Sequence, residues 1–374
     1  MSQILPLPSL EIKGYRGIRE LRIERLGRAN LIVGKNSVGK TSILEAIRLY
    51  LQPASLDLLV HILESRDEHL DETNNTIDSH PLAVTNLFNR REAIRDTTRP
   101  IEIRTLVQEN PPLVISCESV LLPPTHLRGT IVYSELTSGP ILIGRSTLRF
   151  ELGKQICYLI LDGESVGKRR RGGVRIIKSI TANEGEPWVS FVGQSGIDRF
   201  LIGQAWDRIV FTDLEKEIIS ALQIISPDVE RIVLAGDESN STFRVPVAKL
   251  KGLPGPVTIR SLGDGVSRMF GLALQMVQAR NGVLLIDEIE NGIHYSVQAD
   301  LWRFLFALGQ RLNVQIIATS HSFDMIKAFQ IAASENEQEE GFLIRLQRDG
   351  EDIRVTEFDE EELEVVARKQ IEVR

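Results

Sequence analysis

The chain has 374 residues, a mass of 42.0 kDa, a formal net charge of −7 and two cysteines. Its length allows a large core, and 42% hydrophobic with 25% charged residues is ordinary for a soluble globular protein. No apolar run approaches the roughly 18 residues needed to cross a bilayer, and the first ten residues lack a signal-peptide pattern. We therefore expect a cytoplasmic protein that contacts no membrane, and the net acidity excludes a surface that is positive throughout.

The first elements read as a β-hairpin, a strand and a helix. Leu10 and Ile12 alternate with polar neighbours, the turn Tyr15-Arg16-Gly17 follows, and Leu21 and Ile23 resume the alternation. A buried strand is predicted at 31–33 and a helix from 40 to about 52. Helical spacing of apolar residues then predicts a further helix to about Asp78.

A phosphate-binding pattern lies between that strand and the first helix. The run fits G-x-x-x-x-G-K-[ST] and continues into a serine: Gly34, Lys35, Asn36, Ser37, Val38, Gly39, Lys40, Thr41 and Ser42. Such a loop points backbone N–H groups at phosphates beside a helix N-terminus. Lys40 is expected to reach the β- and γ-phosphates, and Thr41 to hold Mg²⁺. This context predicts binding of a nucleoside triphosphate.

Short apolar runs separated by turn residues predict a β-rich segment over about 100–180. It interrupts the nucleotide-binding core. Cys117 and Cys157 have no metal-ligand spacing and are expected to pack as small apolar side chains. The basic run Lys168–Arg171 has two readings, a solvated turn or a loop tip that contacts phosphates.

Helix returns near Thr212, where Thr212 and Glu215 have capping-box spacing. Strands are predicted over 231–234 and 242–247. Ser261, Gly263 and Gly265 then open another helix and form a second anion site, which one nucleotide on the first loop does not need. It would serve the nucleotide of another subunit. The alternative is an ordinary helix cap by Ser261.

Two adjacent carboxylates follow a strand of four apolar residues at 283–286. Such a strand is buried on both faces, and successive side chains point to opposite sides. Asp287 suits a Mg²⁺ ligand, whereas Glu288 suits a group that orients and deprotonates an attacking water. The two carboxylates are therefore predicted to have different functions.

A further buried strand, 314–319, ends in Ser320, His321 and Ser322. His321 is expected to hydrogen-bond the γ-phosphate and to sense its loss. His294 either touches a neighbouring subunit or is a satisfied loop histidine. An acidic surface loop over 335–340, a hairpin from strands 342–346 and 353–358, and a charged helix complete the prediction.

These elements together resemble the ABC-type ATPase heads of the SMC, RecF and OLD (overcoming lysogenization defect) proteins, most of all the OLD-like AAA ATPases of prokaryotes. The resemblance rests on the Walker A loop 34–41, the signature-like segment 261–265, the Walker B pair, the D-loop counterpart 290–294 and the switch histidine. It implies an α/β P-loop NTPase with a mixed central sheet flanked by helices. The core would come from about 1–52 and 205–374, with a β-rich insert over about 53–204, in one composite domain.

The resemblance also implies a homodimer that holds two ATP molecules with Mg²⁺, each between the Walker A loop of one subunit and the segment Ser261–Gly265 of the other. The chain departs from full-length OLD proteins because only about fifty residues follow His321, without a Toprim-sized acidic core. Any nuclease would be a separate polypeptide. No Q-loop glutamine is assigned.

The leading hypothesis is an ATPase with DNA-linked work in repair or anti-phage defence, in which Lys40, Glu288 and His321 take part in catalysis. A nucleotide-gated interaction module with slow turnover is the main alternative. A transporter ATPase subunit is a weaker one, and GTP is disfavoured because the chain has no N-K-x-D motif.

Overall fold

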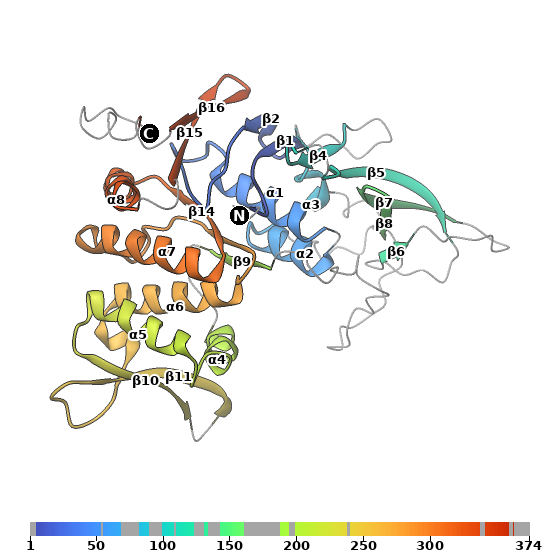
Figure 1. Ribbon diagram of the computed structural model, residues 1–374. Coiled ribbons are helices and arrows are strands. Elements are labelled where there is room, and N and C mark those ends of the chain that lie inside the picture. The colour runs from blue at the N-terminus through green and yellow to red at the C-terminus, as the bar shows by residue number, and fades with distance from the viewer. Residues whose placement is uncertain are drawn as a thin grey trace.

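The computed structural model describes residues 5–53, 55–68, 82–89, 99–107, 110–122, 131–133, 143–160, 188–193, 199–237, 240–336, 341–358 and 362. A six-stranded sheet forms its centre, in the order β16-β15-β3-β14-β13-β9 (Figure 1). The strands are β3 (Ala29–Gly34), β9 (Val189–Val192), β13 (Val283–Ile286), β14 (Gln315–Ser320), β15 (Gly341–Asp349) and β16 (Asp352–Phe358). Only β16 is antiparallel to its neighbour, so the sheet is mixed, as predicted.

Both faces of this central sheet are buried, which explains the unbroken apolar runs of its strands. Leu284 and Ile286 pack into one hydrophobic cluster, whereas Val283 and Leu285 pack into another. The first cluster contains α4 (Arg199–Asp207), α5 (Asp213–Ile225), α6 (Asp264–Gln278), α7 (Gln298–Leu312) and α8 (Phe323–Ser334). The second contains α1 (Lys40–Leu51) and α2 (Leu56–Glu64), on the other side of the sheet (Figure 1).

The predicted N-terminal hairpin is confirmed as β1 (Leu10–Tyr15) and β2 (Ile18–Ile23). It belongs to a seven-stranded antiparallel sheet in the order β2-β1-β4-β5-β7-β8-β6. The added strands are β4 (Ile101–Arg104), β5 (Leu113–Leu122), β6 (Ile131–Tyr133), β7 (Ile143–Leu152) and β8 (Gln155–Ile160), with the one-turn helix α3 (Leu82–Thr85) before them. The β-rich segment is thus confirmed, and it extends the hairpin as one continuous sheet.

One strand from the expected insert range 53–204 lies in the central sheet instead. β9 pairs in parallel with β13, and Val189 stands opposite Val283. Four residues with mixed burial do not reveal from composition which sheet they join, because that choice depends on the partner strand. The boundary predicted near residue 204 therefore assigns β9, a strand of the central sheet, to the insert.

Other predicted elements differ in detail. The helix expected to about Asp78 ends at Glu64, and residues 69–78 lie outside the described residues. Thr212 precedes α5, but its hydroxyl donates to the carbonyl of Ile209 instead of capping, and Glu215 accepts the N–H of Phe211. A positive φ at Phe211 turns the chain so that the capping box does not close.

The remaining strands are β10 (Val229–Asp237), β11 (Asn240–Leu250) and β12 (Val257–Thr258), which form a three-stranded sheet. The C-terminal hairpin is confirmed as β15 and β16. The Lys168–Arg171 cluster, residues 337–340 and nearly all of the expected terminal helix lie outside the described residues.

In the part of the chain that the structure covers, none of the helices has the length and apolarity to cross a membrane. Cys117 and Cys157 are buried, neither forms a disulfide, and burial raises the pKa of the Cys157 thiol to about 12.

Candidate nucleotide-binding site

The phosphate loop joins the end of β3 to the start of α1, as predicted. Gly34 and Gly39 have φ angles of 156° and 114°, and Ser37 has a φ of 62°. A Cβ on Gly34 would lie 2.6 Å from the backbone oxygen of Leu346 on the neighbouring strand, so no side chain fits there. Glycine at these positions lets the loop curl around the N-terminus of α1.

Lys40 is buried, and its ammonium is held by carbonyl groups of the phosphate loop. Its Nζ donates to the carbonyl oxygens of Gly34 (2.7 Å) and Lys35 (3.1 Å). Burial lowers the pKa of Lys40, while Glu290, Glu288 and Asp287 oppose this effect. One desolvated cation therefore faces three carboxylates, an arrangement typical of functional sites.

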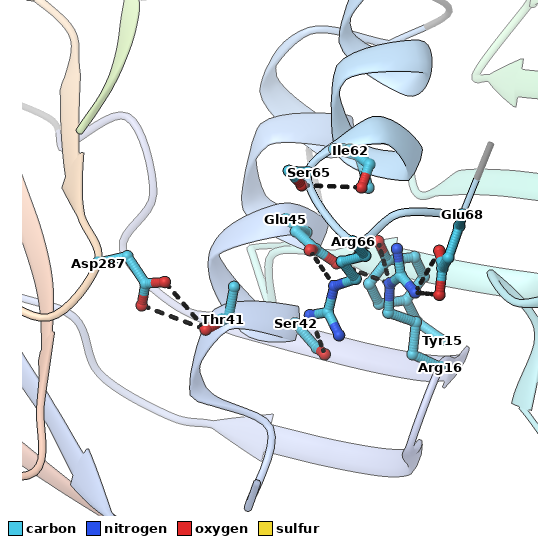
Figure 2. Close-up of polar contacts among 10 residues, drawn as sticks. All are labelled: Tyr15, Arg16, Thr41, Ser42, Glu45, Ile62, Ser65, Arg66, Glu68 and Asp287. Carbon is cyan, nitrogen blue, oxygen red and sulfur yellow. Dashed lines mark hydrogen bonds and ion pairs between the residues drawn. The ribbon is translucent and has the colours of Figure 1, made fainter. Parts of the chain in front are cut away.

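The Asp287 carboxylate joins three elements. Oδ1 and Oδ2 accept the Thr41 hydroxyl at 3.3 and 3.0 Å (Figure 2), and Oδ1 accepts the Thr319 hydroxyl at 2.7 Å. Thr319 Oγ1 also accepts the Glu288 N–H (2.9 Å). This buried threonine at the end of β14 thus orients the Asp287 carboxylate and holds the backbone of Glu288, a role that the sequence pattern did not indicate.

The hydroxyl of Thr41 and the carboxylate of Asp287 fit Mg²⁺, which prefers oxygen ligands. Within the described residues no group of three or more His, Cys, Asp or Glu side chains could hold a metal by itself. Mg²⁺ in nucleotide sites is commonly held by one or two protein oxygens together with phosphate oxygens and water. The donor set present here matches that pattern.

Thr319→Val is expected to lower the free energy of unfolding by about 1–3 kcal/mol, because it leaves the Glu288 N–H without its hydroxyl acceptor and removes one of the two hydroxyls that donate to the buried Asp287 carboxylate. Urea denaturation measures this loss. Thr356→Val is the matched control, since Thr356 lies half-buried on β16 outside the site, and its effect should stay below about 0.5 kcal/mol. Equal effects of the two substitutions would contradict the assigned role of Thr319.

Glu288 follows the end of β13 with a positive φ of 49°. A non-glycine residue rarely adopts this conformation, and such strain is often found at functional sites. Its side chain lines the cavity described below, and Oε2 accepts the Asn291 side-chain amide at 2.9 Å. The separation of Asp287 and Glu288 was predicted from strand alternation. It results instead from this local backbone turn, because β13 ends at Ile286.

His321 lies beyond the end of β14 and faces Glu290. Glu290 Oε1 contacts the ring Nδ1 at 2.9 Å and accepts the backbone N–H of His321 at 2.8 Å. The Glu290 side chain is 10% exposed and that of His321 is 45% exposed. His321 does not line the same cavity as Lys40 and Asp287 among the described residues. The sequence pattern missed Glu290 as a partner of the histidine, because only the fold brings the two strand ends together.

The signature-like residues lie apart from this cluster. Ser261 belongs to a separate 3-10 helix, η2 (Ile259–Leu262), and its hydroxyl is 2.6 Å from that of Thr258. The N-cap of α6 is Gly263, so the alternative interpretation, in which Ser261 caps this helix, is wrong. Ser261 and Gly263 are exposed, and a Cβ on Gly265 would lie 3.8 Å from the carbonyl oxygen of Gly292.

His294 caps a second 3-10 helix, η3 (Tyr295–Val297). Its Nδ1 is 2.9 Å from the Ser296 hydroxyl, and its ring lies 4.3 Å from that of Tyr295. Both rings are exposed to solvent. The satisfied loop histidine is therefore observed within the chain, and a contact with another subunit stays a prediction.

An ionic network lies beside α1, one turn farther along the helix than Thr41 (Figure 2). Glu45 pairs with Arg16 and Arg66, both at 2.7 Å, and accepts the Tyr15 hydroxyl at 3.0 Å. Arg16 also pairs with Glu68 at 2.9 Å. Sequence reasoning recognised Tyr15-Arg16-Gly17 as a motif but had no signal for these partners.

The C-terminal turn of α2 positions two members of this network. Asp67 has a φ of 54°, and the Glu68 N–H donates to the Leu63 carbonyl at 2.9 Å. This is the bonding pattern of a Schellman motif, which ends a helix and reverses the chain. It explains both why the helix stops early and how Arg66 and Glu68 come to face α1.

One cavity of about 1410 Å³ connects the phosphate loop with this network. It is lined by Lys40, Thr41, Asp287 and Glu288 at one end. The rest of its wall comes from α1, the α2 region, β9, α6, the β1–β2 and β15–β16 hairpins and residues 86–89. Asn36, Ser37, Val38, Gly39 and Ser42 also line it. The structure thus brings the predicted Walker A and Walker B residues together.

Two family models match the chain. The model described as "AAA domain, putative AbiEii toxin, Type IV TA system" matches residues 197–324, and the model described as "AAA ATPase domain" matches residues 7–119. The matched ranges contain the signature-like segment with the Walker B pair and the Walker A loop, respectively.

Among curated relatives, an "ATP/GTP phosphatase" of Helicobacter pylori is 22% identical over 345 residues, 86% of this chain and 86% of that protein. A protein of Methanocaldococcus jannaschii, "Uncharacterized protein MJECL10", is 53% identical over 45 residues, 12% of this chain and 20% of its own length. A solved SMC head, bound to the C-terminal winged-helix domain of ScpA, superposes with a TM-score of 0.52 at 15% identity, over 95% of this chain and 98% of that chain. Two parts of the chain are therefore similar to AAA-type ATPase domains, and the fold is an ABC-ATPase fold like that of SMC heads.

Proposed function

We propose that this chain binds ATP with Mg²⁺ and hydrolyses it to ADP and phosphate. The observation that carries the proposal is the convergence of Lys40, Thr41, Asp287 and Glu288 on one cavity at the N-terminus of α1. A phosphate loop and two acidic residues that follow a parallel strand of the same sheet are the parts that phosphoryl transfer requires. The AAA-type domains and the relative named an ATP/GTP phosphatase support hydrolysis at the level of the family.

In this mechanism the Lys40 ammonium neutralises charge on the β- and γ-phosphates. The Glu288 carboxylate orients a water and accepts its proton while the water oxygen attacks the γ-phosphorus in line and the bond to the ADP oxygen breaks. Thr41 and Asp287 would hold Mg²⁺, which supplies further charge neutralisation. His321, held by Glu290, would contact the γ-phosphate from the end of β14.

The signature-like segment would complete the site of a second copy of the chain. Its exposure and its distance from the cavity within one protomer support this arrangement. The helix N-terminus at Gly263 and Gly265, with Ser261 nearby, offers N–H groups and a positive dipole end to phosphates. The active form would then be a homodimer around two ATP molecules.

Gly265→Asp tests the dimer, because a Cβ added at 265 would lie 3.8 Å from its nearest neighbour, the carbonyl oxygen of Gly292, which is an ordinary contact. The substitution should preserve the fold and nucleotide binding while its negative charge repels the partner's phosphates. Light scattering of a Glu288→Gln background with ATP should show dimer, and the same background with Gly265→Asp should show monomer. Gly265→Ala is the control and should remain dimeric. A dimer that persists with Gly265→Asp would contradict this interface.

Glu290→Gln tests the role of the contact between Glu290 and His321. The amide keeps the size of the side chain but removes the charge that favours a hydrogen on Nδ1 of His321, so kcat is expected to fall about tenfold with little change in KM for ATP. Steady-state phosphate release measures both parameters. The kcat and KM of Glu290→Gln are compared with those of Asn291→Ala, which removes the neighbouring hydrogen bond to the Glu288 side chain. If Glu290→Gln raises KM and leaves kcat unchanged, Glu290 acts on ATP binding instead.

On the basis of the same motifs, we propose that the chain is related to the OLD-like and RecF/SMC-like ATPases. Its function would then be linked to DNA, in repair or anti-phage defence, with a separate nuclease as partner. Phosphate release with and without DNA tests the link to DNA. Gln194, two residues beyond the end of β9, lies outside the described residues. Because it follows Gly193 at the wall of the cavity, it is our candidate for the Q-loop glutamine.

A further inference from the structure

The cavity extends well beyond the phosphate loop. At about 1410 Å³ it exceeds the roughly 300–1,000 Å³ of typical small-ligand sites. The part farthest along α1 is lined by residues of α1, the α2 region and β9, which we call the distal pocket: Arg48, His61, Ser65, Arg66 and Phe191. No step of the proposed hydrolysis uses this part.

Arg48 is set apart from the phosphate loop by the geometry of α1. Thr41, Glu45 and Arg48 follow one another at i, i+4 and i+7, so they share the face of the helix that lines the cavity. At 1.5 Å per residue, Arg48 lies about 10 Å along the helix axis from Thr41. A group bound at Arg48 would therefore be separate from phosphates on the loop.

The carboxylates near Arg48 already have other partners. Glu45 is paired with Arg16 and Arg66, and Glu68 is paired with Arg16. Arg48 itself has neither a hydrogen-bond acceptor for its guanidinium nor an ion pair among the described residues. Its contact is with the ring of Phe191, whose centroid lies 4.2 Å from its Cζ.

Arg48 as a whole residue is only 9% exposed, yet it lines the cavity. Burial lowers the pKa of Arg48 to about 10, and Glu45 and Tyr15 offset only part of that effect. Burial and then Arg48 lower the pKa of His61. A buried cation without a counterion is costly, so the pocket favours an anion beside Arg48.

We propose that the distal pocket binds a second anion of the phosphate class, separate from the nucleotide on the Walker A loop. Guanidinium groups present paired N–H donors that match phosphate oxygens, and stacking on Phe191 leaves the edge of the Arg48 group available for them. Inorganic phosphate and the phosphate of a mononucleotide share this chemistry. If the occupant is inorganic phosphate released from ATP, that origin rests on the proposed ATPase function. The anion site itself does not depend on that function.

Isothermal titration calorimetry of the full chain tests the site with inorganic phosphate and, separately, with AMP. Each titration is done with the Walker A loop empty and saturated with Mg²⁺ and a non-hydrolysable ATP analogue. We expect one phosphate site that survives saturation. Binding of AMP but not phosphate under saturation would identify a mononucleotide as the occupant.

Arg48→Met should weaken phosphate binding at least tenfold and leave binding of the analogue unchanged, since methionine keeps the apolar stem of the side chain. Lys40→Ala should do the reverse. Arg348→Met is the matched control, because Arg348 is another arginine that lines the cavity, and it should bind phosphate as the unaltered chain does. Phe191→Leu keeps the guanidinium without its ring and should weaken phosphate binding severalfold, which provides a second variant if Arg48→Met does not fold.

Phosphate affinity that is unchanged in both Arg48→Met and Phe191→Leu, or loss of both phosphate and AMP binding when the loop is saturated, would overturn the proposal. Phosphate that binds a chain lacking ATPase activity would refute the proposed function and leave the distal pocket standing. ATPase activity without a second phosphate site would do the opposite.

Discussion

Lys40→Ala is expected to reduce phosphate release from ATP by at least about a hundredfold, close to the background of the assay. Removal of a single preorganised group that stabilises transition-state charge costs about 10²–10³ in rate, and Lys40 also contributes to binding of the β- and γ-phosphates. Its Nζ is buried and oriented by the Gly34 and Lys35 carbonyls, so no neighbouring lysine can replace it. Phosphate release by the purified chain at saturating MgATP measures the effect.

Lys249→Ala is the control for that measurement. Lys249 is an exposed lysine on β11 that pairs with Glu230 at the surface, and its loss should leave the rate within twofold. Circular dichroism and thermal unfolding should show that both variants are folded. Equal rates for the unaltered chain and Lys40→Ala would remove the hydrolytic assignment.

Glu288→Gln is expected to lower kcat by about 10²–10⁴, the usual contribution of a general base, while ATP still binds. The amide retains the size of the side chain and a hydrogen-bonding group toward Asn291, whose amide donates to Glu288 Oε2 at 2.9 Å. It cannot accept a proton from water. Single-turnover hydrolysis, together with a separate measurement of nucleotide affinity, distinguishes loss of chemistry from loss of binding.

Glu230→Gln, on the exposed surface of β10, is the matched carboxylate control and should behave as the unaltered chain. The Glu288→Gln variant also separates two functions. An ATP-driven motor would stop, whereas a nucleotide-gated interaction module would keep signalling in its ATP-bound state. If Glu288→Gln hydrolyses ATP at the normal rate, another group activates the water.

The local motifs were predictable because each depends on residues that are close in the chain. The glycines of 34–39 permit a loop that few other sequences form, and four apolar residues before Asp287 identify a strand buried on both faces. Parallel strands end at one edge of a sheet, so the meeting of these two motifs could also be expected. The mixed α/β fold was expected from the family resemblance that these motifs carry.

Tertiary structure decided the partners of these residues. Thr319 and Asp287 are 32 positions apart, Thr41 and Asp287 are 246 apart, and β9 reaches β13 across 94 positions from Val189 to Val283. Contacts over such separations depend on the order of the strands in the sheet. The local periodicity of the sequence does not encode this order. The pairing of Glu290 with His321, the position of Ser261 in η2 and the burial of Arg48 over Phe191 have the same origin. Chain-local chemistry therefore specified the phosphate loop and the acidic pair, and long-range packing specified how they are oriented and what else shares their cavity.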